Sequence, residues 1–158
     1  MDAVKICVVG AEGSGKSQFI HKFCAFTAAA TPRGQEDVWN KKFKIGSKTR
    51  MAEFFDSYGP TAQRREFIES MSKDDYIFVL YNGTSTASLL QALNDAEDVM
   101  QYAKGPKWLL LCNNWFGKQV LDNSREVMKF QQRINADYLV VDVQNKVGYP
   151  QVQKYLFQ

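Results

Sequence analysis

Three glycines, a lysine and a serine stand close together near the start of the chain, in Gly10-Ala11-Glu12-Gly13-Ser14-Gly15-Lys16-Ser17. Glycine tolerates the backbone conformations that turn several consecutive N–H groups toward one anion. A lysine beside them can neutralise phosphate oxygens, and the serine hydroxyl can bind Mg²⁺. The pattern G-x-x-x-x-G-K-[ST] therefore predicts a loop that binds the phosphates of a Mg²⁺–nucleotide, and an accidental glycine-rich turn is the weaker interpretation.

This loop stands between two segments that predict a strand and a helix. Lys5-Ile6-Cys7-Val8-Val9 is short, apolar and β-branched, which favours a buried strand. Ser17 to Phe26 carries apolar residues at helical spacing. A helix that begins where the loop ends adds its N-terminal dipole to the anion site. The pattern thus has the strand–loop–helix context that phosphate binding requires.

The rest of the chain alternates short apolar runs with helically patterned segments. Further strands are predicted at Trp39–Ile45, Arg50–Phe55, Tyr76–Tyr81, Trp108–Cys112 and Tyr138–Val141, the first two as a hairpin around Gly46-Ser47-Lys48 and the other three buried. Helices are predicted at Thr84–Ala103, at Val120–Ile134 and from Pro150, whereas Pro60–Met71 is irregular or helical. This order predicts an α/β fold: a doubly wound, mostly parallel six-stranded sheet with helices on both faces, in one domain over residues 1–158.

Composition excludes several classes of protein. Lys and Arg number 20 against 17 Asp and Glu, with no run of five or six like charges, so no nucleic-acid partner is expected. The three cysteines are far apart and form no CxxC pair, which favours reduced core thiols in a cytoplasmic protein. No signal peptide, membrane span or lipidation motif is recognisable, so we expect no membrane anchor in this chain.

A few side chains have ordinary structural interpretations. His21, the only histidine, is expected on the exposed face of the first helix, and Arg64-Arg65-Glu66 and Lys41-Lys42 on solvated faces. Leu89 and Leu90 are both expected on the apolar stripe of the helix at Thr84–Ala103.

A second chemical pattern, Asp56-Ser57-Tyr58-Gly59, follows the predicted strand at Arg50–Phe55. An aspartate at a strand's end can hold Mg²⁺ through water, and a glycine three residues later can offer its N–H to a γ-phosphate. The same pattern also makes ordinary turns, but its place after a hairpin and before an irregular segment favours the phosphate role. With these two patterns, the chain resembles the Ras superfamily of small GTPases, Rab- or Arf-like, over essentially its whole length.

The resemblance implies a role for individual residues. Ser17 and Asp56 would be Mg²⁺ ligands, joined by a threonine of the first switch, the segment between Phe26 and Val38: Thr31 or, as second choice, Thr27. Asp56 and Gly59 would be the second-switch pair. The implied nucleotide-binding residues are Gly10, Glu12, Gly13, Ser14, Gly15, Lys16, Ser17, Gly59, Asn113, Asn145 and Lys146.

Two departures from the family pattern predict slow or absent hydrolysis. The family places a glutamine after the DxxG glycine to orient the attacking water, whereas this chain has Pro60. Gln63, three residues further on, is the remaining candidate for that role. Glu12 adds a negative charge where the γ-phosphate would lie.

The base-reading motifs also depart from the family. The family's Asn-Lys-x-Asp is Asn113-Asn114-Trp115-Phe116 here, and its Ser-Ala-Lys motif is Gln144-Asn145-Lys146. Losing the aspartate removes a bidentate charged contact to guanine, which predicts weaker affinity or selectivity. Trp115 and Phe116 would stack on the base or, as the favoured interpretation, form a partner-binding patch.

These features together predict a divergent small GTPase-like molecular switch or binding module. It would bind GTP or GDP with Mg²⁺ and act through protein partners that contact residues 27–45 and 57–72. One alternative is a pseudo-GTPase, nucleotide-free or permanently liganded, serving as a structural subunit of a trafficking or ciliary transport assembly. The other is a small P-loop phosphotransferase, for which Arg64-Arg65 would be the only candidate for an arginine-rich lid.

Overall fold

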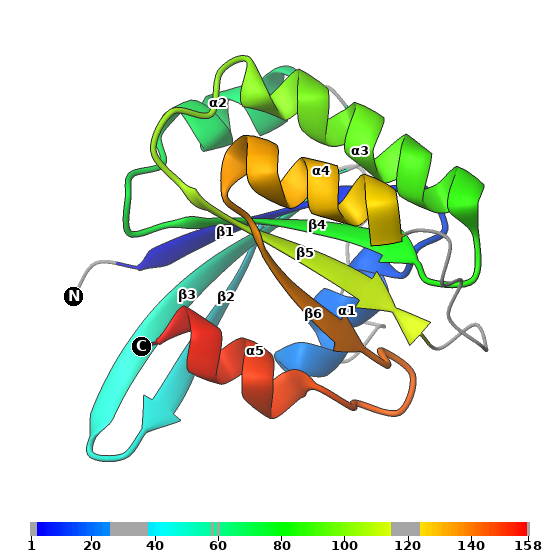
Figure 1. Ribbon diagram of the computed structural model, residues 1–158. Helices are drawn as coiled ribbons and strands as arrows, with labels where there is room; N and C mark the ends of the chain where they lie inside the picture. The colour runs from blue at the N-terminus through cyan, green and yellow to red at the C-terminus, as the bar shows by residue number, and fades with distance from the viewer. Residues whose placement is uncertain (1–2, 26–37, 58, 60, 115–123, 158) are drawn as a thin grey trace.

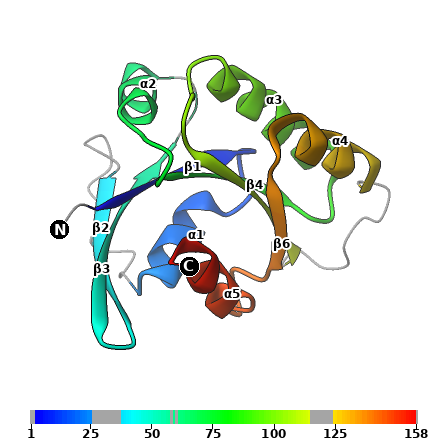
Figure 2. The same cartoon turned by 60° about the vertical axis from the view of Figure 1, so that its left-hand side comes forward.

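The computed structural model describes residues 3–25, 38–57, 59, 61–114 and 124–157. In chain order the elements are β1 (Val4–Gly10), α1 (Lys16–Phe23), β2 (Val38–Ile45), β3 (Lys48–Asp56), α2 (Ala62–Glu69), β4 (Tyr76–Asn82), α3 (Thr86–Met100), β5 (Lys107–Asn113), α4 (Ser124–Ile134), β6 (Asp137–Val141) and α5 (Tyr149–Leu156). The strands form one six-stranded sheet in the order β2-β3-β1-β4-β5-β6. Of the described helices, α2, α3 and α4 cover one face and α1 and α5 the other (Figure 1 and Figure 2).

The sheet is parallel except at one edge, where β2 pairs with β3 in an antiparallel hairpin. The three central runs Ile6–Val9, Ile77–Tyr81 and Leu109–Cys112 are fully buried because helices cover both faces of the strands. Side chains alternate along each strand and so feed two separate apolar cores, one on each face. The predicted doubly wound, mostly parallel fold is confirmed.

The cysteines belong to these cores, as predicted. Cys7, Cys24 and Cys112 are buried and free of disulfides. Burial raises the pKa of Cys24 to about 12, so this thiol stays protonated and behaves as a small apolar group.

The predicted burial was wrong for β6 and for one position of α3. β6 is the edge strand beyond β5, so only Val141 of its residues is buried and Val140 is 42% exposed. On α3, successive side chains are about 100° apart, so Leu89 reaches the core while Leu90 is 51% exposed.

Two predicted surface residues are buried instead. His21 is 8% exposed because its ring packs on Trp39 of the neighbouring β2, 4.9 Å between ring centroids. Arg64 is 0% exposed and pairs with Asp95 and Asp98 of α3. In both cases the covering group comes from a distant part of the chain, which helical spacing alone does not reveal.

Among the described residues, no helix is both long and apolar enough to cross a membrane.

Candidate nucleotide-binding site

The glycine-rich loop runs from the end of β1 to the start of α1, at the carboxyl edge of the parallel strands. Gly10 has φ +135°, and a Cβ on it would lie 2.1 Å from the carbonyl oxygen of Leu80 on β4. Gly13 has φ +72°, but a Cβ there would meet nothing within 4 Å. Position 10 thus requires glycine because its backbone lies against β4. Position 13 favours glycine only for its positive φ, which lets the loop turn on its open side.

The N-terminus of α1 has no side-chain cap. Its capping residue is Gly15, and the first helical bond runs from the Phe19 N–H to the Gly15 carbonyl, 2.8 Å between N and O. The N–H groups of a first helical turn have no partner within the helix, and together with the helix dipole they favour an anion. The geometry therefore suits a phosphate group in front of α1.

Lys16 is half-buried over the same loop. Its Nζ donates to the carbonyl oxygens of Ala11 at 3.0 Å and Gly10 at 3.3 Å. Burial lowers the pKa of Lys16 below its ordinary value of 10.5, although Asp56, Asp95 and Glu12 act in the opposite direction. An ammonium group that is costly to keep charged at this place would be stabilised by a neighbouring phosphate.

Ser17 and Asp56 are brought together by the sheet. β1 pairs with β3 so that Val8 lies opposite Asp56, which places the aspartate beside the first turn of α1. The Ser17 Oγ donates a hydrogen bond to the Asp56 Oδ2. A hydroxyl and a carboxylate are hard oxygen ligands of the type that Mg²⁺ uses together with substrate phosphates, so this pair fits the ion. Thr31 and Thr27 lie outside the described residues.

No self-sufficient metal centre is present in the described part of the chain. Those residues contain no group of three or more His, Cys, Asp or Glu that could hold an ion. A Mg²⁺ ion at Ser17 and Asp56 would consequently take its remaining ligands from phosphate, water or the first switch.

Asn113 is fully buried at the end of β5 and joins two loops. Its Nδ2 donates to the Ser14 carbonyl oxygen at 2.9 Å, and its Oδ1 accepts from the Val143 N–H at 3.2 Å. The side chain therefore ties the phosphate loop to the segment after β6. Its predicted direct contact with a nucleotide stays a prediction.

The segment after β6 forms a turn closed by Asp142 and Val147, whose backbone groups bond to each other at 3.0 Å in both directions. The Asp142 carboxylate accepts from the backbone N–H of Asn145 at 3.1 Å and from its Nδ2 at 2.8 Å. Lys146 is exposed and has φ +59°. Asn145 and Lys146 thus lie in this turn, whereas Trp115 and Phe116 lie outside the described residues.

This turn also rests on α1. The Gln18 Nε2 donates to the Gln144 Oε1 at 2.7 Å, and the Lys22 Nζ donates to the Gln144 carbonyl oxygen at 2.9 Å. The turn and the phosphate loop are therefore connected twice, through α1 and through Asn113.

Of the residues that the sequence linked to hydrolysis, Gln63 and Glu12 are described, and both are exposed. Gln63 is exposed in the first turn of α2, behind the cap formed by Thr61. The Gly59 N–H lies 3.4 Å from the Ser57 Oγ, and Glu12 is exposed on the phosphate loop. Pro60 lies outside the described residues.

The sequence analysis did not predict that side chains of α3 bind the backbone of the phosphate loop. The Asp95 Oδ2 accepts from the Gly10 N–H at 3.1 Å, and the Gln91 Oε1 accepts from the Glu12 N–H at 3.1 Å. The two side chains are four residues apart, which places them on one side of the helix. The spacing was visible in the sequence, but exposed helix faces commonly carry such polar pairs.

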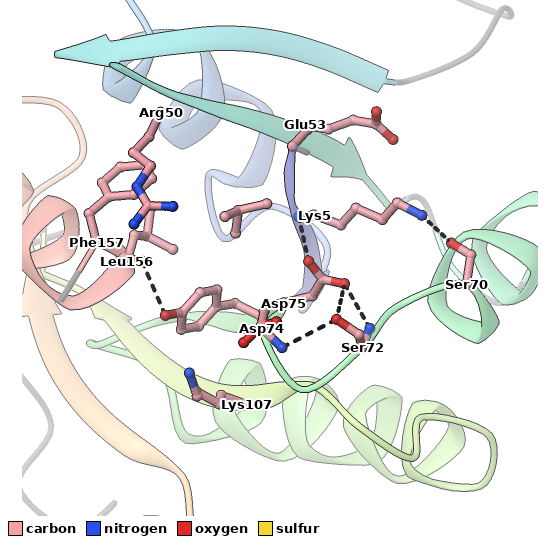
Figure 3. A pocket seen from close by; sticks show the side chains of 13 residues that line it. Lys5, Arg50, Glu53, Ser70, Ser72, Asp74, Asp75, Lys107, Leu156 and Phe157 are labelled. Carbon is pink, nitrogen blue, oxygen red and sulfur yellow. Dashed lines mark hydrogen bonds between the residues drawn. The ribbon is translucent and has the colours of Figure 1, made fainter. Parts of the chain in front are cut away.

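A hollow of about 620 Å³ lies at the end of the sheet opposite the phosphate loop. Figure 3 shows the side chains that line it. It includes Asp75 and Tyr76 at the start of β4. The Asp75 carboxylate accepts from the Lys5 and Ser72 N–H groups, and the Tyr76 hydroxyl donates to the Leu156 carbonyl oxygen. These polar groups are bonded within the protein. The hollow lies at the amino ends of β1 and β4, whereas the phosphate loop follows the carboxyl end of β1.

Comparison with known families agrees with this geometry. The model of the Ras family matches residues 5–151, a segment that contains the phosphate loop, Asp56, Asn113 and the turn after β6. A search of curated proteins finds no match. Since the matched segment covers most of the sequence, the chain belongs to the Ras family, whose members are small GTPases that bind nucleotide through a P-loop.

Proposed function

We propose that this protein binds GDP or GTP together with Mg²⁺, hydrolyses GTP slowly or not at all, and acts through protein partners. The observation that carries the proposal is the Lys16 ammonium group, half-buried over a glycine-rich loop and bonded to two carbonyl oxygens. A phosphate in front of α1 would be bound by this cation and by the N–H groups of the first turn.

The proposed metal ligands are Ser17 and Asp56, with Thr31 as a third from the first switch. The direct bond between Ser17 and Asp56 supports the pairing, since both oxygens converge on one point beside the loop. When bound, Mg²⁺ neutralises charge on the β- and γ-phosphates. Ser17 and Asp56 would supply hard oxygen ligands and fix the place of the ion beside the loop.

Slow hydrolysis is supported by the segment after Asp56. Pro60 offers no side-chain donor or acceptor that could orient water, and Gln63 is exposed on α2. Glu12 adds negative charge on the phosphate loop, where charge accumulates on the transferring group. Binding without efficient turnover is the outcome expected from this combination.

The proposed partner surfaces are residues 27–45 and 57–72. In the described part of this set, β2 is an edge strand that exposes Lys42 and Lys44 while Phe43 points inward. The outer face of α2 exposes Arg65 and Glu69, which pair at 3.5 Å. An exposed strand edge beside a charged helix face offers both main-chain and side-chain contacts to a protein.

A second candidate function is that of a pseudo-GTPase, a structural subunit of a trafficking or ciliary transport assembly that works without nucleotide exchange. It is favoured by the internal bonds of the loop: Lys16 is bonded to carbonyl oxygens of the loop and Ser17 to Asp56. Such a loop keeps its polar groups satisfied through protein contacts.

The nucleotide content of purified, denatured protein and titration calorimetry with GDP and Mg²⁺ separate these candidates. We expect the parent to bind GDP and Lys16→Ala to bind it at least about tenfold more weakly, because a charge-assisted hydrogen bond contributes roughly 1.5–3 kcal/mol. Lys154→Ala removes an exposed lysine of α5 and is the control for net charge. Equal affinity of the parent and Lys16→Ala would contradict the proposed phosphate site, and no binding by the parent would favour the pseudo-GTPase.

Turnover is tested separately, by single-turnover release of phosphate from GTP. Pro60→Gln should raise the rate, because it restores a side chain able to orient water. An intrinsic rate in the parent on the order of 10⁻⁴ per second, as in an ordinary small GTPase, would contradict slow hydrolysis. In that event Gln63→Leu identifies whether Gln63 orients the water.

A further inference from the structure

A buried arginine joins α2, the helix that follows the second-switch pair Asp56 and Gly59, to α3. The Arg64 side chain is completely buried, and its NH1 lies 2.9 Å from both carboxylate oxygens of Asp95. Its NH2 donates to the Asp98 Oδ2 at 2.9 Å. Burial acts to lower the pKa of Arg64, but Asp95 and Tyr102 together outweigh burial, and the pKa stands above its ordinary value. The guanidinium group therefore stays charged and keeps its carboxylate partners.

Arg64 also contacts the segment between Asp56 and Gly59. Its NH1 donates to the Ser57 Oγ at 3.0 Å, and the same oxygen lies 3.4 Å from the Gly59 N–H. Ser57 is 1% exposed, and its own N–H donates to the Val8 carbonyl oxygen on β1 at 3.1 Å. A displacement of the segment between Asp56 and Gly59 would strain or break the hydrogen bond between Ser57 and Arg64, because the guanidinium group is fixed inside a packed interior.

The carboxylate of Asp95 is shared between Arg64 and the phosphate loop. Besides Arg64, its Oδ2 accepts from the Gly10 N–H at 3.1 Å. Both oxygens are thus acceptors, and Asp95 is the point where the second switch and the loop meet. One turn earlier on α3, Gln91 holds the Glu12 N–H.

We propose that Asp95 and Arg64 are positioning residues: Asp95 holds the phosphate loop in its binding conformation, and Arg64 links that loop to the second switch. The inference rests on the proposed nucleotide binding for its functional consequence. Coupling between two sites is reciprocal. Nucleotide on the loop would accordingly stabilise α2, and loosening of α2 would weaken nucleotide binding.

The test compares Asp95→Asn with Asp98→Asn, two identical changes in charge next to the same arginine. An asparagine at 95 has one accepting oxygen, so its donating NH2 group would face the Gly10 N–H or Arg64, both of which are donors. An asparagine at 98 can still accept with its single oxygen. Hydrogen exchange of the backbone over residues 10–17 and GDP affinity are the two measurements.

We expect Asp95→Asn to speed exchange over residues 10–17 and to weaken GDP binding at least about tenfold, with less than about threefold change for Asp98→Asn. The double variant Arg64→Met/Asp95→Asn has no uncompensated buried charge and should restore the slow exchange, because the asparagine oxygen is then free to accept from Gly10. In the parent, GDP should slow exchange over α2 as well, and in the double variant it should not.

The outcomes separate the two proposals. A parent that binds no GDP would overturn the proposed function, while exchange over residues 10–17 in the free protein would still decide the role of Asp95. Equal exchange in Asp95→Asn and Asp98→Asn would overturn the positioning role. If Asp95→Asn does not fold, the double variant replaces it, and GDP-dependent protection of α2 in that variant would show that Arg64 does not provide the link.

Discussion

The phosphate loop and the turn after β6 lie at the same edge of the sheet but use the chain in different ways. The phosphate loop presents its backbone: positive φ at Gly10, Gly13 and Gly15 and an uncapped α1 N-terminus. The turn after β6 presents side chains: the position of the family's Ser-Ala-Lys motif reads Gln144-Asn145-Lys146, with the lysine retained.

Under the proposed nucleotide binding, this difference predicts that the phosphate half of the site is kept while the base half is altered. A backbone cradle depends on a few glycines and one lysine, so the surrounding positions can change freely. Recognition of a base depends on the identity of each contacting side chain, and every substitution alters it. Phosphate binding is therefore expected to be preserved better than guanine selectivity.

The largest expected effect is that of Gly10→Ala. A Cβ at Gly10 would overlap the Leu80 carbonyl oxygen, so β1 and β4 would have to separate. We expect loss of the cooperative thermal transition, or a large drop in its midpoint. Gly13→Ala is the matched control, because its Cβ meets no atom and costs only the strain of positive φ, about 1–2 kcal/mol. Similar midpoints for the two variants would refute the backbone account of the loop.

The next effect concerns the connection between the two regions. Asn113→Ala leaves the Ser14 carbonyl and the Val143 N–H without this partner, at a cost of roughly 1–3 kcal/mol for each buried group. We expect a comparable loss in the free energy of unfolding, measured with urea. The control is Asn114→Ala, since the buried Asn114 Oδ1 accepts no hydrogen bond from the described residues. An equal loss in both variants would argue against the bridging role.

Selectivity for guanine over other bases measures directly what the turn after β6 contributes to binding. Competition between GDP, ADP and XDP should show that GDP is preferred by less than about a hundredfold, because a missing charged acceptor costs roughly 1.5–3 kcal/mol per hydrogen bond. A thousandfold preference for GDP would show that another residue reads the base. Asn145→Ala would then test an amide of the turn after β6, and Asp122→Asn a carboxylate outside the described residues.

The smallest expected effect is a pH dependence of stability that originates at Lys16. Its pKa is lowered in the folded protein, so folding disfavours the charged form. That penalty is complete below the folded pKa and is relieved as the pH rises from it toward the ordinary value of 10.5. The stability of the parent relative to Lys16→Met should therefore increase over this alkaline range.

Chemical denaturation of both proteins at several pH values measures this difference. Lys146→Met removes one positive charge from the turn after β6 and controls for net charge. A difference between the parent and Lys16→Met that is constant with pH would mean that Lys16 is not penalised by burial.

The sequence by itself determined the phosphate loop and the order of strands and helices. Both are local: the pattern from Gly10 to Ser17 prescribes backbone conformations that glycine permits, and fully apolar runs such as Leu109–Cys112 require a sheet covered on both faces. Ser17 and Asp56, which the family resemblance assigned to Mg²⁺, are in contact in the structure because parallel strands bring their carboxyl ends to one edge.

Only the tertiary structure decided which polar side chains are buried and which apolar ones are exposed. Arg64 and His21 are covered by α3 and β2, whereas Leu90 and Val140 face outward on a helix flank and an edge strand. The bond between Gly10 and Asp95 joins residues 85 positions apart. Local propensity and periodicity report on neighbours within a few residues, so contacts of this range exist only once the sheet has assembled.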